Sequence, residues 1–183
     1  MTKLVDQYKE LHLDDSFYAL SVLSLHKKSI SQFLAVKQCS SILDYGCGKG
    51  NQYHKENIHN ESFYGIMPAL YDPAVKEYSK MPKGTFDSVI STDVLEHIEE
   101  EDLDQVLEEI YSKADKFVYL GICNSPAEAI LLDGRNAHVT IQSIDWWVDK
   151  VLPHANTFTV LHVYGKQGKS TAILENNIIK MKK

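Results

Sequence analysis

The sequence is poor in cysteine and has no long apolar run. The chain has 183 residues, and its three cysteines, Cys39, Cys47 and Cys123, are too few and too widely spaced for a disulfide framework or a zinc motif. No run of about 18 apolar residues occurs, which argues against a transmembrane helix. Residues 1–10 lack the apolar core of a signal peptide. We therefore expect a cytoplasmic protein with no membrane partner and no bound metal.

Positive charge is scarce as well. The formal net charge is −6, acidic residues cluster at 99–104, and the one basic concentration is a short tail, Lys180, Lys182 and Lys183. Nucleic-acid-binding domains present a broad basic face to phosphates, so we expect no nucleic-acid partner. Of the 19 basic residues only Arg135 is an arginine. Either composition bias explains this, or Arg135 has a specific role that lysine would not fill.

Helical and strand patterns alternate along the chain, and no linker or repeat divides it. Helical patterns cover residues 17–38, capped by Asp15 and Ser16, and residues 49–57, 99–113 and 144–152; strand patterns cover 41–45, 63–71, 86–91 and 116–123, and a hairpin joins 157–164 to 171–176. This alternation predicts an α/β fold with a Rossmann-like, doubly wound sheet and helices on both faces. The hairpin adds one antiparallel strand to an otherwise parallel sheet. Ligands of such sheets bind at the carboxyl ends of the strands.

A glycine loop follows the first predicted strand. Gly46, Gly48 and Gly50 allow a tight turn and a close approach of the backbone to a ligand, although an ordinary strand–helix turn can look the same. A dinucleotide-binding fingerprint would need glycine at position 51, which is Asn51. A P-loop is excluded because Lys49 is not followed by Ser or Thr. Two acids add specificity: Asp44 precedes the loop, and Asp72 ends the next strand pattern, where an acid can bind a ribose.

Two motifs resemble those of class I S-adenosylmethionine-dependent methyltransferases, in the branch with small-molecule members. They are LDYGCGKG at 43–50 and FDSVISTDVLEHI at 86–98, and the resemblance spans about residues 40–122. It implies that S-adenosylmethionine is the cofactor, that the segment with Asp44, Gly46, Cys47 and Gly48 holds its methionine part, that Asp72 holds the ribose, and that Asp93 lies beside it.

The sequence departs from this family between Asp72 and Phe86. Residues 73–85 are too few for the helix, third strand and adenine-binding acid that the family places there. We interpret residues 78–82 as a reduced third strand. Backbone and apolar groups would then hold the adenine, with Met67 and Met81 as candidates, although core packing is the more common role of methionine.

The acceptor site is predicted from the residues that follow the strands. Methyl transfer from a sulfonium needs mainly an aligned acceptor, sometimes with a general base. His97 is a candidate base, or else packs or caps a turn. The loop at 124–140 should lie over the pocket mouth: Arg135 and Asn136 would bind an acidic acceptor, and His138 would be a base or orienting group.

Each acceptor assignment has a simpler alternative. Arg135 would pair with Asp133 on the surface, and His138 would cap the next element. Trp146 is the candidate to wall the pocket, because two adjacent tryptophans cannot share one helix face. The N-terminal segment 6–18 is a candidate lid.

The sequence thus predicts one methyltransferase domain, 1–183, acting on a small-molecule acceptor, for which Arg135 suggests an acidic group. It would comprise a helical cap (1–38), a cofactor-binding core (39–122), an acceptor loop and helix (123–153) and a terminal hairpin (154–183). DNA amino-methyltransferases are disfavoured because residues 91–94 lack their Asn/Asp-Pro-Pro-aromatic tetrad. A non-catalytic cofactor-binding regulatory module and a protein methyltransferase remain alternatives.

Overall fold

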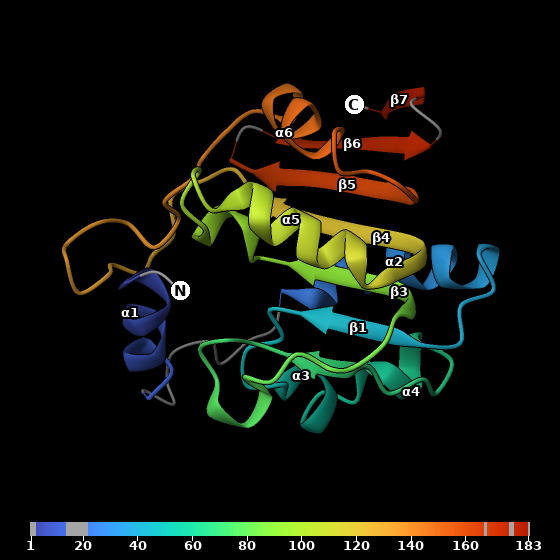
Figure 1. Cartoon of the computed structure of the whole chain (residues 1–183), viewed down its shortest axis with the longest axis horizontal. Helices are drawn as coiled ribbons and strands as arrows, with labels where there is room; N and C mark the ends of the chain where they lie inside the picture. Colours follow the sequence, from blue (N-terminus) through green and yellow to red (C-terminus); the bar gives the residue numbers. More distant parts are fainter. Residues whose placement is uncertain (1–2, 14–21, 167, 176–177, 183) are drawn as a thin grey trace.

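The protein is built on one seven-stranded mixed sheet with helices packed against it (Figure 1). The computed structural model describes residues 3–13, 22–166, 168–175 and 178–182. The strands are β1 (Ile42–Tyr45), β2 (Ala69–Tyr71), β3 (Phe86–Thr92), β4 (Ala114–Cys123), β5 (Phe158–Gly165), β6 (Gly168–Glu175) and β7 (Ile178–Lys182). Their spatial order is β2-β1-β3-β4-β5-β6-β7.

The sheet is mostly parallel, as predicted. Strands β1 to β5 pair in parallel, β6 is antiparallel to β5, and β7 is antiparallel to β6. Because β7 reverses the direction again, β6 is the only described strand that opposes the rest. The predicted hairpin is therefore confirmed, but β7 was not expected, since its sequence had been interpreted as a basic tail.

Helices cover both faces of the sheet. They are α1 (Lys3–Leu11), α2 (Leu23–Val36), α3 (Asn51–His54), α4 (Ile58–Ser62), α5 (Leu103–Ser112) and α6 (Ile144–Val151), with 3-10 turns η1 (Lys76–Tyr78) and η2 (Leu95–His97). Val89 packs with α5 and α6 in one apolar cluster, and its neighbour Ile90 packs with α2 and α4 in another. Adjacent strand residues point to opposite faces, so the sheet carries a core on each side (Figure 1).

Several predicted boundaries were wrong. Helix α5 begins at Leu103 rather than residue 99, because residues 100–102 form turns. Only Ala69–Tyr71 of the predicted strand 63–71 pairs with the sheet. The helix predicted at 49–57 is only the four-residue α3, and a second short helix, α4, begins after Asn57, whose φ is 56°. Helix α2 begins at Leu23, and the expected cap at Asp15 and Ser16 lies outside the described residues.

The reduced third strand predicted at 78–82 is absent. The segment after β2 forms η1 and then irregular backbone, so β2 is an edge of the sheet among the described strands. Two anchors hold this segment in place: Lys113 Nζ donates to the carbonyls of Pro82 (3.0 Å) and Gly84 (3.2 Å).

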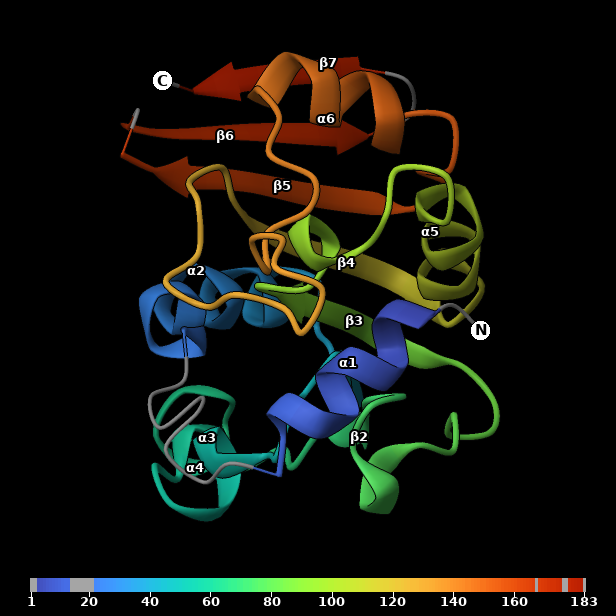
Figure 2. The same ribbon diagram turned by 90° about the vertical axis from the view of Figure 1, so that its left-hand side faces the viewer.

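The carboxyl ends of the parallel strands meet at one edge of the molecule, and α1 lies across this edge (Figure 2). The described part of the chain contains no helix with the length and apolarity needed to cross a lipid bilayer.

Candidate functional site

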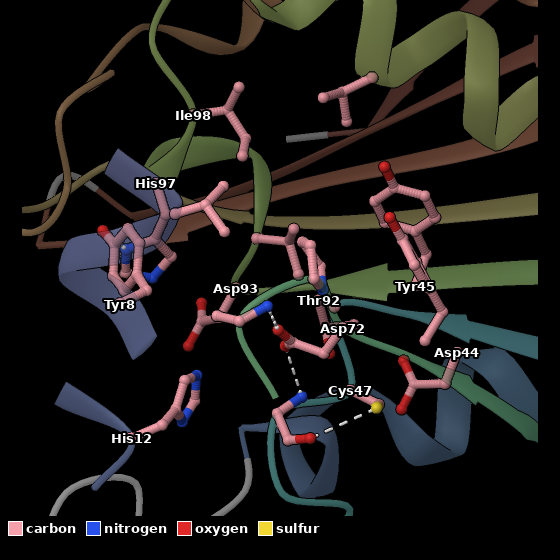
Figure 3. Close-up of a pocket in the computed structure, with 18 of the residues that line it drawn as sticks. Tyr8, His12, Asp44, Tyr45, Cys47, Asp72, Thr92, Asp93, His97 and Ile98 are labelled. Atoms are coloured by element: carbon pink, nitrogen blue, oxygen red, sulfur yellow. Dashed lines mark hydrogen bonds between the residues drawn. The ribbon is translucent and has the colours of Figure 1, made fainter. Parts of the chain in front are cut away.

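A cavity of about 420 Å³ opens at the carboxyl ends of β1, β2 and β3 (Figure 3). Its floor is the glycine loop, and its sides come from the ends of β2 and β3 and from α5. The N-terminal segment closes it from above with Val5, Tyr8 and His12. A cavity of this size is within the range that holds a drug-sized ligand.

The glycine loop turns its amide groups inward. The N–H groups of Gly46 and Cys47 donate to the carbonyl of Tyr71 (2.7 and 3.1 Å), and that of Gly48 donates to Asp72 Oδ2 (2.9 Å). Gly50 N–H donates to the carbonyl of Cys47 (3.1 Å). The following helix, α3, has only four residues. Four N–H groups of the loop are therefore already used, and the long helix that helps to bind phosphate groups elsewhere is missing here.

Asp72 combines burial with unused acceptor capacity. Its carboxylate is 8% exposed and lines the cavity. Oδ2 accepts from Gly48 N, and Oδ1 accepts from Ala74 N at 2.8 Å. Because an ionised carboxylate offers about four acceptor sites, two remain for donors on a ligand, as a pair of ribose hydroxyls would require.

Asp44 is buried in β1 at the base of the cavity. Its Oδ2 accepts from Gln52 Nε2 (3.0 Å) and from the hydroxyl of Tyr53 (2.8 Å). Burial raises the pKa of Asp44 to about 6, against the opposing effect of these two donors, and the charge of Asp72 raises it further. The neighbouring Cys47 thiol is also buried, which raises its pKa and keeps it neutral.

Asp93 lies at the end of β3 in a strained conformation. Its φ of 55° is uncommon for a residue other than glycine and often marks functional positions. Its N–H donates to the carbonyl of Gly121 (2.9 Å), and its Oδ1 accepts from the hydroxyl of Tyr164. These contacts fix the carboxylate at the cavity wall (Figure 3).

Acidic groups dominate the cavity wall. Five carboxyl side chains line it: Asp44, Asp72, Asp93, Asp102 and Glu109. Lys49 is the single lysine among the lining residues, and burial lowers the pKa of both lining histidines, His12 and His97. Such a wall attracts a cation and repels phosphates.

His97 is held as a neutral imidazole. The hydroxyl of Tyr8 donates to the carbonyl of Ala137 (2.6 Å), and His97 Nδ1 lies 2.8 Å from that hydroxyl and 3.0 Å from the same carbonyl. When Nδ1 carries the proton, it can donate to both the Tyr8 hydroxyl and the Ala137 carbonyl. Nε2 then remains a hydrogen-bond acceptor. Burial, and then the nearby His138, lower the pKa of His97 to about 3.

The structure brings together every predicted cofactor residue. Asp44, Gly46, Cys47, Gly48, Asp72 and Asp93 all line the cavity, together with His97. Met67 and Met81, the candidates for adenine contacts, do not: Met67 is 44% exposed, and Met81 packs against the core.

The predicted acceptor residues lie elsewhere. Arg135 is on the surface, where its guanidinium pairs with Glu99 (2.7 Å) and Asp133 (3.0 Å). The Asn136 side chain closes its own loop by donating to the carbonyl of Ala127 (2.8 Å) and accepting from the N–H groups of Ala127 and His138. This placement favours the surface-loop interpretation of Arg135 and a structural role for Asn136.

His138 and Trp146 are also outside the cavity lining. His138 Nδ1 lies 2.5 Å from the carbonyl of Ser125, and its ring packs edge-on against His97. Trp146 is half-buried against the core, and Trp147 is fully buried within it. Core packing accounts for both tryptophans.

Sequence reasoning missed one group of lining residues. Asp102, Gln105, Val106 and Glu109 form one stripe of α5 and the turn before it, at i, i+3, i+4 and i+7. The spacing of this stripe can be found in the sequence, where Val106 also belongs to the apolar stripe of the same helix. Tyr45 joins this group because its hydroxyl donates to Glu109 Oε2 at 2.6 Å.

Helix α1 lies where the lid was predicted. It covers the cavity and packs through Leu4 on Leu131 and Ala137 of the loop at 124–140. The remainder of the predicted lid, residues 14–18, lies outside the described residues.

No protein-family model and no curated protein matches this chain. The geometry of the cavity therefore carries the functional argument.

Proposed function

We propose that this protein is a class I S-adenosylmethionine-dependent methyltransferase with a Rossmann-like, doubly wound fold, and that the cavity is its cofactor site. One observation carries the proposal: five carboxyl groups line one cavity together with a glycine loop, four of whose amides already donate hydrogen bonds within the protein. S-adenosylmethionine has a sulfonium, an ammonium and one carboxylate, so its net charge is positive. Nicotinamide dinucleotides and nucleoside triphosphates are polyanions and do not suit this wall.

The residues present fit the parts of this cofactor. Asp72 would accept hydrogen bonds from the two ribose hydroxyls with its unused acceptor sites. Asp44 and Asp93, on either side of the glycine loop, would balance the ammonium and sulfonium charges. The cofactor supplies a methyl group already activated on sulfur, so the chain has only to bind and align the acceptor.

The adenine would be held without an acidic partner. Pro73 and Ala74 line the cavity next to Asp72, and Thr92 and Val94 line it from β3 and the residues beyond. These groups offer apolar surface and backbone atoms. The shortened 73–85 interval is compatible with adenine binding of this kind.

The acceptor is better described as a small neutral or basic molecule than as an acid. Arg135 is not among the lining residues, and the carboxylates of the wall would repel an anion. His97 is a poor proton acceptor because its pKa is about 3, but its neutral Nε2 can accept a hydrogen bond from a hydroxyl or amine. We therefore assign His97 an orienting role, and the helix α1 above it restricts the site to small acceptors.

A non-catalytic S-adenosylmethionine-binding module is the second candidate. It is favoured by the placement of the expected acceptor residues Arg135, Asn136, His138 and Trp146 outside the cavity lining. Such a module would bind the cofactor and report its presence through α1.

Calorimetry with S-adenosylmethionine and S-adenosylhomocysteine tests the cofactor assignment. We expect binding by the wild type, binding weakened about 10- to 100-fold in Asp72→Asn, since hydrogen bonds to a charged group contribute roughly 1.5–3 kcal/mol, and unchanged binding in the control Asp149→Asn on the exposed side of α6. Failure of both compounds to bind the folded wild type would remove both candidate functions. Binding without release of S-adenosylhomocysteine on a panel of amines and phenols would favour the module.

A further inference from the structure

A second cluster of polar side chains lies beside the cavity and is not used by the proposed cofactor site. It consists of Glu96 in η2, Cys123 at the end of β4, and His138 in the loop at 124–140. One ligand-type atom from each lies within 4.8 Å of the others. The three residues are too far apart in the sequence to form a recognisable metal-binding spacing.

Glu96 has a buried oxygen that receives no hydrogen bond. The residue is 0% exposed; its Oε1 accepts from Cys123 N–H at 2.6 Å, while no donor among the described residues reaches Oε2, and the side chain instead contacts the carboxyl group of Asp93. A buried polar atom without a partner destabilises a fold, and a buried carboxylate does so strongly unless a cation accompanies it. Burial, the charge of Asp93 and a side-chain hydrogen bond with Asp93 raise the pKa of Glu96 well above its ordinary value, so without a cation Glu96 is protonated and donates to Asp93.

The hydrogen bond of His138 fixes its tautomer in the way that a metal-ligating histidine requires. Its Nδ1 lies 2.5 Å from the carbonyl of Ser125, which can only accept, so Nδ1 carries the proton. Nε2 is then left with its lone pair. In metal sites, a ligating imidazole usually donates its other N–H to a carbonyl or carboxylate in this way.

Cys123 completes a mixed donor set. Its thiol is half-buried, and burial raises its pKa, so it is protonated in the absence of a cation. One sulfur, one imidazole nitrogen and one carboxylate oxygen are typical ligands of Zn²⁺. The partial exposure of Cys123 and His138 provides a path for an ion from solvent.

We propose that Glu96 Oε2, Cys123 Sγ and His138 Nε2 bind one Zn²⁺, with water at the fourth position. Binding releases the thiol proton and the carboxyl proton to solvent, since both ligands coordinate in their ionised forms. The ion then joins η2, the end of β4 and the acceptor loop. The proposal does not require the cofactor assignment, because none of the three residues lines the cavity, but the two sites meet at Asp93, which lines the cavity and contacts Glu96.

Cobalt titration of the reduced, chelator-treated protein tests the site. We expect a thiolate-to-cobalt charge-transfer absorption that saturates at one equivalent and disappears when zinc is added. Cys123→Ser should abolish this band, whereas Cys39→Ser, which changes another half-buried cysteine that follows α2, should retain it. A band that is absent from the wild type, or that persists in folded Cys123→Ser, would overturn the proposal.

Two further measurements guard against a folding defect. His138→Gln changes a half-buried side chain, and it should weaken cobalt binding by more than about 100-fold, the upper end of the loss found for outer ligand partners. Zinc should raise the melting temperature of the wild type but not of His138→Gln. Equal cobalt affinity in both proteins would mean that Glu96 is simply a protonated buried acid.

Discussion

Gly46 and Val94 are packed so closely that no other residue fits at position 46. A Cβ at Gly46 would lie 2.3 Å from Val94 Cγ2, and the φ of Gly46 is +83°. The position of the glycine loop is therefore fixed by Val94. Gly46 belongs to the motif at 43–50 and Val94 to the motif at 86–98, so the two motifs are in contact at this point.

Gly46→Ala should be strongly destabilising for two reasons, backbone strain and a clash with Val94. Gly134→Ala separates these two causes. Gly134 has nearly the same φ, +85°, but nothing lies within 4 Å of an added Cβ. Gly134→Ala should cost only the backbone strain, about 1–2 kcal/mol, whereas Gly46→Ala should cost roughly 1–3 kcal/mol more through overpacking. Urea denaturation measures both. Equal losses of stability in the two variants would show that the Val94 side chain moves aside. Adding Val94→Ala to Gly46→Ala should recover part of the additional loss.

The buried carboxyl of Asp44 should make stability decrease as the pH rises. Its folded pKa of about 6 lies above the ordinary value of 3.8, so the folded state binds more protons than the unfolded state between these values. Stability from this group is full below about pH 4 and is lost as the pH passes 6, by about 3 kcal/mol in total. Asp44→Asn should lack this decrease in denaturation curves. An identical pH profile in the variant would contradict the assignment.

The same group should couple cofactor binding to pH. A cationic ligand prefers the ionised form of Asp44, so affinity for S-adenosylmethionine should fall about tenfold per pH unit below pH 6. Calorimetry at pH 5, 6 and 7 measures this, and Asp44→Asn should flatten the dependence.

Arg135→Ala and Asn136→Ala should differ sharply although the residues are adjacent. The Arg135 ion pairs are exposed, so the variant should fold normally and keep its affinity for cofactor and acceptor. Asn136 makes three hydrogen bonds within its loop, and its loss should cost about 1–3 kcal/mol. Hydrogen exchange should show faster exchange at 124–140 for Asn136→Ala alone. A loss of acceptor affinity in Arg135→Ala would restore the original acidic-acceptor hypothesis.

The docking of α1 should depend on Leu4 and Tyr8. Leu4 is 5% exposed in its small apolar cluster, and Tyr8 bonds the Ala137 carbonyl. Leu4→Ala and Tyr8→Phe should each speed proteolysis of residues 3–13, and S-adenosylmethionine should slow it in the wild type. A matched change on the exposed side of α1, Glu10→Gln, should have no effect. Cleavage that is insensitive to Leu4→Ala would mean that α1 does not act as a lid.

The parts of the fold that sequence predicted best were those with one strong local signal. Strands β1, β3 and β4 are short apolar runs, and α6 begins at Ser143, whose side chain accepts from Trp146 N–H. The boundaries that failed depended on tertiary contacts. Residues 63–68 have strand-like composition, but Phe63 is buried against α2 and α4 rather than paired in the sheet.

The residues of the candidate site also fall into a group that the sequence predicted and a group that it did not. Asp44 lies in β1, and the glycines, Asp72 and Asp93 directly follow strands, so their positions are fixed by the sheet and could be predicted. Arg135 and His138 lie in a loop whose path is set by the side chain of Asn136 and by α1. Neither of these contacts produces a periodic pattern in the sequence. The Glu96, Cys123 and His138 cluster was hidden for the same reason.

The position of α1 has a thermodynamic consequence. One face of this helix closes the cavity through Val5 and Tyr8, while Leu4 holds the loop at 124–140. A ligand that orders α1 therefore also orders that loop. The first ligand to bind, cofactor or acceptor, meets the free-energy cost of closing α1 over the cavity, and the second ligand does not meet it again. Cofactor and acceptor should then bind cooperatively, each raising the affinity of the other by the same factor.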